Sequence, residues 1–294
     1  MPLNSFEEEW RWHSRFFERT AVGWMSTKHG FMLVLESLTH MDPPPDIRHL
    51  RDLLRFRLKL KHVMKYQKKD FPDLVSYNRF VEIMEYALVP LILYIIKARF
   101  VKCSGISFVD STPIKVCDHH RIKSHRVFSE YAKRGKSSMG WFYGFKLHLI
   151  INEEGELLSF CLTSGNVDDR NEAVMDSLTK EIFGKLFANR GYISQKLFEK
   201  LLKRDITLIT RAKKNMKNKL MNLYDRLMLR KRTVIESVND FLKNICDIEH
   251  SRHRSITNFL VNLVSALAAY SFLPKKPSIC SASDMPKGIL CLVD

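Results

Sequence analysis

Residues 140–152 read GWFYGFKLHLIIN, and this stretch decides which kind of fold the chain adopts. Its residues alternate between an apolar side that begins at Trp141 and a polar side that carries Lys146 and His148. A period of two residues is typical of a β-strand. A Glu-Glu-Gly turn separates it from a second alternating run at residues 156–163, so the two runs predict a β-hairpin.

Outward from this hairpin, the pattern predicts an α/β fold. Before the hairpin, a short apolar run, ISFVD, ends in the carboxylate of Asp110. After it, the periodicity predicts a helix at 168–183, a strand at 185–189, a helix at 194–204 with Ser194 as its N-cap, and a strand at 206–210. Three antiparallel strands followed by alternating helix and strand give a mixed sheet flanked by helices. In that arrangement the first and fourth strands are neighbours, so we expect Asp110 and Asn189 to lie close together.

The last helix predicted by periodicity is residues 229–243, LRKRTVIESVNDFLK. Its apolar residues recur at spacings of three and four, while Arg232, Glu236 and Lys243 share the opposite face, with the carboxylate between two cations. One interpretation is an ordinary surface helix with ion pairs. The other is that the helix brings Glu236 over Asp110, which would build a divalent-metal site for phosphoryl transfer.

The composition indicates a globular, basic protein. Of 294 residues, 45% are hydrophobic, which supports a sizeable core. Lys and Arg total 48 against 32 Asp and Glu, and the net charge of +16 favours a polyanionic partner, either nucleic acid or a membrane surface. The longest apolar runs fall short of the ~20 residues that a bilayer span needs, so we expect core helices. The six cysteines form no C-x-x-C pair, which is typical of free thiols in a reducing compartment.

Two basic segments are candidates for phosphate contact. The denser one precedes and enters the last predicted helix, and a solvated linker is its alternative. Its candidate DNA-binding residues are Arg211, Lys213, Lys214, Lys217, Lys219, Arg230 and Lys231. The other segment, residues 48–69, fits equally well a DNA-contacting helix and a solvated basic helix.

Other polar residues give weaker signals. His119, His120, His125 and His148 have a spacing that fits no common zinc-ligand set, so we expect solvated loop residues and one histidine on a strand surface. Asp168 and Asp169, at the start of the segment 168–183, could in principle replace the second carboxylate, but nothing in the sequence places them at the end of a central strand. Tyr192 follows Arg-Gly after the strand at 185–189 and is predicted to pack in the core.

Several motifs together carry a resemblance to a known family. They read FVDSTPIKV, RGKSSMGWFYGFKLHLIIN, SFCLTSGNVDDRNE, KLFANRGYIS, ITRAKKNMKN, RKRTVIESVNDFLKN and IEHSRHRS. Between residues 66 and 279 the chain resembles the DDE transposases of bacterial insertion sequences. The resemblance implies a ribonuclease-H-like catalytic domain that cleaves and transfers DNA strands with two bound divalent cations, Mg²⁺ or Mn²⁺.

The resemblance also assigns roles to individual residues. Asp110 and Glu236 match the first and last catalytic carboxylates, which are metal ligands, and Arg232 and Lys243 match the basic residues that support the glutamate. Asn189 occupies the position of the second catalytic aspartate. A carboxamide supplies a neutral oxygen without the charge, so we expect weakened metal binding and impaired strand cleavage. A catalytically inactive DNA-binding remnant and a structure-selective nuclease of the same fold are the alternatives.

The resemblance further implies how the chain is organised. We expect a helical N-terminal region at residues 1–100, with DNA contact as an open possibility, and the catalytic domain at 101–279. Residues 1–65 and the tail at 280–294 do not resemble the family. The implied partner is DNA bearing the terminal inverted repeats of the element, bound by a homo-oligomer, with no membrane, in the bacterial cytoplasm at the nucleoid.

Overall fold

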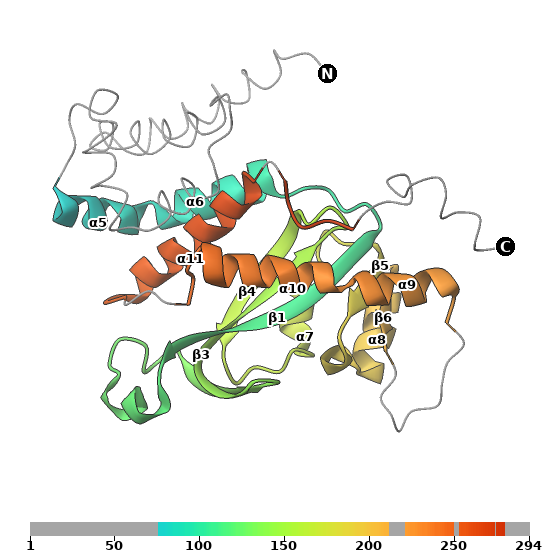
Figure 1. The fold of residues 1–294 in the computed structure, drawn as a ribbon, viewed down its shortest axis with the longest axis horizontal. Coiled ribbons are helices and arrows are strands. Elements are labelled where there is room, and N and C mark those ends of the chain that lie inside the picture. The colour runs from blue at the N-terminus through green and yellow to red at the C-terminus, as the bar shows by residue number, and fades with distance from the viewer. Residues whose placement is uncertain (1–75, 212–220, 250–252, 274, 280–294) are drawn as a thin grey trace, which may run out of the picture. The chain divides into compact units, whose positions relative to one another are not determined.

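The computed structural model describes residues 76–211, 221–249, 253–273 and 275–279 (Figure 1). The chain divides into two compact units, one of residues 1–53 with 57–83 and the other of residues 54–56 with 84–294. All of the sheet belongs to the second unit. The basic segment at 48–69 and the tail at 280–294 lie outside the described residues.

A mixed six-stranded sheet forms the centre of the second unit. Its strands are β1 (Ile106–Cys117), β2 (Lys133–Ser137), β3 (Gly140–Ile151), β4 (Leu157–Ser164), β5 (Gly184–Ala188) and β6 (Ile206–Thr210). The order is β2-β3-β1-β5-β6, and β4 also pairs with β3. β3 is antiparallel to β1, β2 and β4, whereas β1, β5 and β6 are parallel. The predicted mixed sheet, with ribonuclease-H-like connectivity, is confirmed.

Two strands differ from the prediction. β1 continues through Cys117 instead of ending at Asp110, and it includes Pro113, which lies beyond the last residue of β1 that pairs with β5. One edge of β1 is free of β5 there, so proline can be accommodated. β2, for which the sequence pattern predicts no strand, pairs with the first residues of β3.

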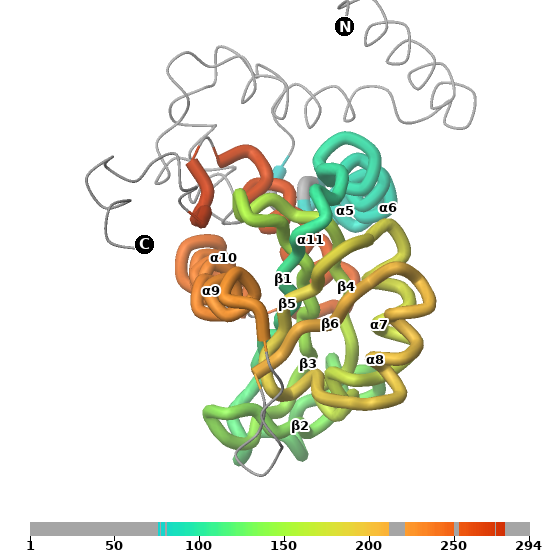
Figure 2. Tube along the Cα trace, turned by 90° about the vertical axis from the view of Figure 1, so that its right-hand side faces the viewer, coloured from blue at the N-terminus to red at the C-terminus, as the bar shows by residue number. Residues whose placement is uncertain are grey.

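Helices cover both faces of the sheet (Figure 2). One face carries α7 (Glu172–Leu178) and α8 (Gln195–Leu202), and the other carries α9 (Leu223–Lys231), α10 (Thr233–Asp240) and the π-helical turn η4 (Phe241–Ile245). The remaining helical elements are α5 (Tyr77–Tyr86), α6 (Leu88–Tyr94), η1 (Ile95–Arg99), η2 (His119–Ser124), η3 (Arg190–Tyr192) and α11 (Ile256–Ser271). Most of α11 is buried, and no helix among the described residues is long and apolar enough to cross a membrane.

Because β3 is central and covered on both faces, its polar side is not exposed as expected. His148 is fully buried rather than on a strand surface, and its Nε2 lies 3.0 Å from the hydroxyl oxygen of Thr163. The Lys146 ammonium donates to Asp169 at 3.0 Å. Conversely, Trp141 at the open start of β3 is 59% exposed, although it belongs to the apolar side.

An apolar core lies between the sheet and the α7–α8 face. It includes Val109 from β1, Leu186 and Ala188 from β5, Leu197 from α8, and Tyr192 just after β5. The prediction that Tyr192 packs in the core is confirmed, since its side chain is fully buried. Alternation along β1 and β5 therefore sends Asp110 and Asn189 to the opposite face, under α10.

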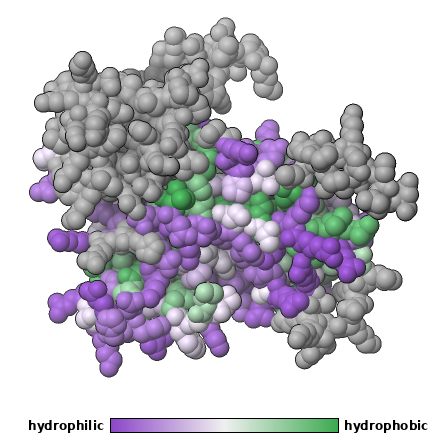
Figure 3. Space-filling view, in the orientation of Figure 1, coloured by the Kyte–Doolittle hydropathy of each residue, from purple (hydrophilic) through white to green (hydrophobic). Residues whose placement is uncertain are grey.

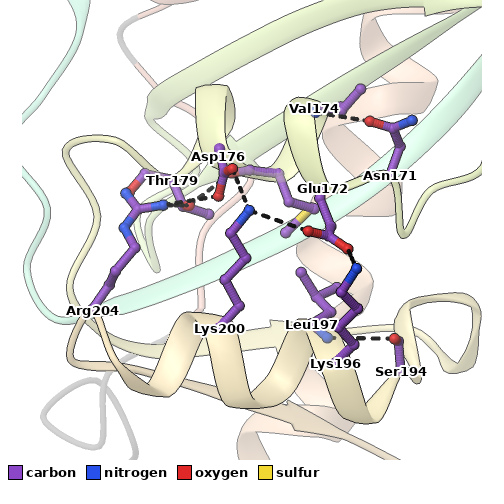
Figure 4. Close-up of polar contacts among 11 residues, drawn as sticks. Asn171, Glu172, Val174, Asp176, Thr179, Ser194, Lys196, Leu197, Lys200 and Arg204 are labelled. Atoms are coloured by element: carbon purple, nitrogen blue, oxygen red, sulfur yellow. Dashed lines mark hydrogen bonds and ion pairs between the residues drawn. The ribbon is translucent and has the colours of Figure 1, made fainter.

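A network of ion pairs joins α7 to α8 (Figure 4). Asp176 accepts from Lys200 at 2.5 Å and lies 3.5 Å from Arg204, while Glu172 lies 2.6 Å from Lys196 and 3.4 Å from Lys200. The predicted N-cap of α8 is confirmed, because the Ser194 hydroxyl oxygen accepts from the backbone N–H of Leu197. These contacts fix the two helices that support the end of β5.

Candidate active site

The sheet register places Asp110 beside Asn189. Phe108 pairs with Phe187 and Val109 with Ala188 in parallel register, and the two phenylalanine rings stack with their centroids 5.5 Å apart. Asp110 and Asn189 come next on each strand and lie on the same face as these rings. The predicted proximity of their side chains is therefore present in the structure.

The Asn189 amide has a defined orientation. Its Oδ1 accepts from the backbone N–H of Gly191 at 2.7 Å, and its Nδ2 donates to Asp110 Oδ1 at 2.9 Å. A backbone N–H can only donate, so the oxygen of the amide must face Gly191 and the NH₂ group must face Asp110. A Cβ at position 191 would lie 2.8 Å from Asn189 Oδ1, so glycine provides room for this contact.

The helix over Asp110 is broken rather than continuous. The segment predicted as one helix divides at Arg232, where α9 ends and α10 begins. Arg232 Nη2 pairs with Glu236 one turn later, and Arg232 Nη1 lies 3.9 Å from Asp110 Oδ1. The Glu236 side chain remains 51% exposed. The helix therefore brings Glu236 to the same site, but tied to an arginine.

Sequence reasoning missed Asn239 as a partner of Asp110. Asn239 is buried, and its Nδ2 lies 3.4 Å from Asp110 Oδ2. The only available signal was its place one turn after Glu236, on the polar face of the same helix. With Asn189 and Asn239, both carboxylate oxygens of Asp110 face amide NH₂ groups.

Burial dominates the electrostatics of Asp110. Loss of solvent raises the pKa of this carboxyl from 3.8 to about 6, although the Arg232 charge and the Ser111 N–H oppose the shift. The nearby Glu236 carboxylate raises it further, and the hydrogen bond from Asn189 lowers it. The site thus holds Asp110 with too little positive charge to restore the usual acidity of a carboxyl group.

Lys243, which the resemblance assigns to support Glu236, has a carboxylate partner of its own. It lies in the π-helical turn η4 and pairs with Glu249 at 3.1 Å. The other oxygen of Glu249 accepts from the backbone N–H of Lys115 on β1 at 3.2 Å. Lys243 therefore ties the end of α10 to β1, and its support for the site is indirect.

A pocket of about 590 Å³ opens beside Asn189 and Glu236. Hydrophilic side chains gather over α9 and the neighbouring end of α10, at its rim (Figure 3). The residues that line it are Ser138, Ala188, Asn189, Arg190, Gly191, Arg211, Leu229, Arg230, Arg232, Thr233 and Glu236. Two predicted DNA-binding residues, Arg211 and Arg230, are therefore at the pocket; Lys231 ends α9 without lining it, and Lys213, Lys214, Lys217 and Lys219 lie outside the described residues.

The chain matches one family model, and this match decides its family. The model describes a transposase DDE domain and matches residues 100–256, more than half of the chain. The chain belongs to the transposase DDE domain family. No curated protein sequence matches it significantly.

Among the solved structures, one that resembles this DDE domain loosely contains DNA. It is the cryo-EM structure of a piggyBac transposase synaptic complex with hairpin DNA, with 10% sequence identity and a TM-score of 0.38. The similarity covers 58% of this chain and 46% of that one, so the chain spans less than half of its neighbour's length. The family match remains the basis of the assignment.

DDE transposase domains generally use divalent metals, and the donor set of this DDE domain can be tested against that requirement. In the part of the chain that the structure describes, no three His, Cys, Asp or Glu residues gather into a metal-binding group. The two other aspartates that could replace the second carboxylate are already paired, Asp169 with Lys146 and Asp168 with Arg170. At the site itself, Asn189 points an N–H donor where a metal needs an oxygen. The residues present do not fit a pair of divalent cations.

Proposed function

We propose that the chain is a DNA transposase of a bacterial insertion sequence, and that its strand cleavage and transfer are impaired at Asn189. It would act at the terminal inverted repeats of its element, as a homo-oligomer on DNA, in the bacterial cytoplasm at the nucleoid. The family match supports the transposase class. The net charge of +16 and the arginines around the pocket support a DNA partner.

The observation that carries the proposed impairment is the hydrogen bond from Asn189 Nδ2 to Asp110 Oδ1. In phosphoryl transfer, paired divalent cations activate the attacking oxygen and stabilise the leaving oxygen, and they need closely spaced anionic ligands. An aspartate at 189 could keep the Gly191 contact with one oxygen and turn its second oxygen towards Asp110. Asparagine turns a donor there instead, and it removes one negative charge.

A second candidate function, DNA binding without cleavage, is also supported by an observation at Asp110. Both oxygens of Asp110 face amide NH₂ groups, so the site is internally satisfied without a cation. This arrangement favours a DNA-binding protein that occupies element ends without cutting them. Such a protein would still use the arginine side chains at the pocket to contact phosphates. Its affinity for DNA would fall as the salt concentration rises.

The experiment is cleavage of a labelled duplex that carries the ends of the encoding element, in Mg²⁺ or Mn²⁺. The protein, Asn189→Asp, and the double variant Asp110→Ala with Asn189→Asp are compared at equal occupancy of DNA. We expect cleavage at the repeat ends by Asn189→Asp alone. Equal cleavage by the unaltered protein would contradict the proposed impairment, and cleavage by the double variant would contradict the role of Asp110.

A competitor separates transposase from nuclease. Excess branched DNA without the repeats should leave end-specific cleavage by Asn189→Asp largely intact. If the branched DNA is cut and abolishes cleavage of the repeats, the chain is a structure-selective nuclease instead. If neither variant binds the repeats more tightly than unrelated duplex, the proposed DNA partner is wrong.

A further inference from the structure

The start of the β2–β3 hairpin presents an exposed aromatic ring next to cations. Lys136 on β2 pairs directly with Trp141 on β3, and its ammonium lies 5.8 Å from the centre of a Trp141 ring. Arg134 lies two residues before Lys136 on the same strand and so projects from the same side of the hairpin. The backbone of Trp141 is fixed by a hydrogen bond, because His119 Nε2 donates to its carbonyl oxygen at 2.9 Å. Trp141 therefore has a fixed backbone and a side chain that is exposed to solvent.

This hairpin borders a second hollow, of about 400 Å³. Arg134, Lys136 and Trp141 line it, together with the loop of residues 165–170. Asp168 and Asp169 in that loop are already paired with Arg170 and Lys146, whereas neither Arg134 nor Lys136 forms an ion pair with a described residue. The hollow thus combines an exposed indole with two uncompensated cations, and this chemistry favours an anionic ligand with flat rings.

The second hollow adjoins the pocket of the candidate active site. Gly191, whose N–H holds the Asn189 amide, lines both of them. Ser138, in the turn that joins β2 to β3, lines the first. The same hairpin therefore borders the route from Trp141 to Asp110 and Asn189, and a polymer lying in one hollow can continue into the other.

We propose that Trp141 stacks an unpaired base of a DNA single strand that leads to the candidate active site, with Arg134 and Lys136 on the adjoining phosphates. This inference rests on the proposed function and extends it by naming where an unwound end is held. A duplex keeps its bases stacked inside and offers only its backbone to such a surface. A single strand offers both a free base and phosphates, which matches an exposed ring beside cations.

The test uses the full-length protein in EDTA with a single-stranded oligonucleotide that carries 2-aminopurine. Stacking on an indole quenches the fluorescence of 2-aminopurine. We therefore expect the unaltered protein to quench this fluorescence and Trp141→Ala to lose the quenching. The affinity of Trp141→Ala for the single strand should fall about tenfold, whereas its affinity for the matching duplex should hardly change. Trp141→Phe should retain part of both signals.

Met139→Ala is the matched control. Met139 lies in the same turn and is 94% exposed, but it is not a lining residue of either hollow. Met139→Ala should quench 2-aminopurine fluorescence and bind the single strand as the unaltered protein does. Retained quenching in Trp141→Ala, or an equal loss of affinity for single strand and duplex, would overturn the proposal.

Charge provides a second measurement with the same oligonucleotide. The double variant Arg134→Gln with Lys136→Gln should bind the single strand more weakly and show a shallower dependence of affinity on salt concentration. An unchanged salt dependence would contradict the proposed contact of Arg134 and Lys136 with phosphates.

The failure of this proposal and that of the proposed function can be told apart. Binding in EDTA needs no metal, so a cleavage-negative Asn189→Asp variant leaves the stacking result unaffected. If Asn189→Asp cuts repeat ends and Trp141→Ala in that background still quenches 2-aminopurine and cuts equally well, only the inference about Trp141 fails.

Discussion

The two faces of the sheet differ in the polar groups that they bury. Between the sheet and α7–α8, buried apolar side chains meet, and the charges at the surface are paired across the helices. Under α10, the buried apolar side chains Phe108, Phe187 and Ile235 surround a polar site. There, Arg232 Nη1 and Asn239 Oδ1 have no hydrogen-bond partner among the described residues. Buried polar atoms without partners cost stability. The difference teaches that one face is packed mainly with apolar side chains, whereas the other combines apolar packing with a polar arrangement that packing alone would not favour.

The largest effect should follow from damage to the apolar face. Leu186 is fully buried between β5 and α7–α8, so Leu186→Ala leaves a cavity and should destabilise the protein by about 4 kcal/mol. Chemical denaturation followed by circular dichroism measures the change. Leu202→Ala is the control, because Leu202 on α8 is 50% exposed and should cost far less. Equal losses would mean that this face does not carry the stability.

The next effect should appear on the polar face, in Asn189→Asp without metal. Two carboxylate oxygens would then face each other where an N–H donor now lies 2.9 Å from Asp110. At pH 8 this repulsion should cost roughly 3 kcal/mol, and Mn²⁺ should recover much of it. Thermal melting in EDTA measures the loss of stability, and melting in Mn²⁺ measures its recovery. The unaltered protein should respond little to Mn²⁺, and a similar response in both proteins would contradict the assigned metal position.

A smaller effect should come from His148, inside the sheet. Burial lowers the pKa of His148 from 6.5 to about 4, against the Asp169 charge, which raises it. Because the folded-state pKa is the lower one, the unfolded chain takes up the proton first, and stability is lost as the pH falls from about 6.5 towards 4. His148→Gln does not titrate, so its stability should fall by about 1 to 2 kcal/mol less between pH 7.5 and 5. Identical pH profiles would show that folding leaves the pKa of His148 unchanged.

The smallest effect should come from the ion pairs of α7 and α8. Asp176→Ala removes the contacts to Lys200 and Arg204, and exposed pairs of this kind contribute little to stability because solvent screens them. Melting at low and high salt measures it, and the difference between variant and parent should shrink as salt rises. A loss as large as that of Leu186→Ala would mean that charge, rather than apolar packing, holds this face.

The elements that could be predicted from sequence are those whose pattern is local. β3, β6 and the Ser194 cap follow from alternation and from capping chemistry. β2 could not be predicted, because its five residues KRGKS carry no apolar pattern and become a strand only by pairing with β3. The exposure of Trp141 and the burial of His148 could not be predicted, because alternation does not tell whether both faces of a strand are covered.

The site shows the same division. The closeness of Asp110 and Asn189 could be predicted, because chain order fixes which strands are neighbours. The break at Arg232, the Glu249 partner of Lys243 and the contact from Asn239 depend on how α9, α10 and η4 pack on the sheet. Helical periodicity gives the face on which a residue lies, but not which partner it meets.

The Gly191 contact of Asn189 has an evolutionary consequence. Asparagine at this position is held by the same backbone N–H that an aspartate would use, so the surrounding geometry is preserved by folding alone. Asparagine and aspartate codons differ in a single base. On the proposed function, an impaired copy that drifts without selection for transposition would stay one point mutation from a complete set of carboxylates.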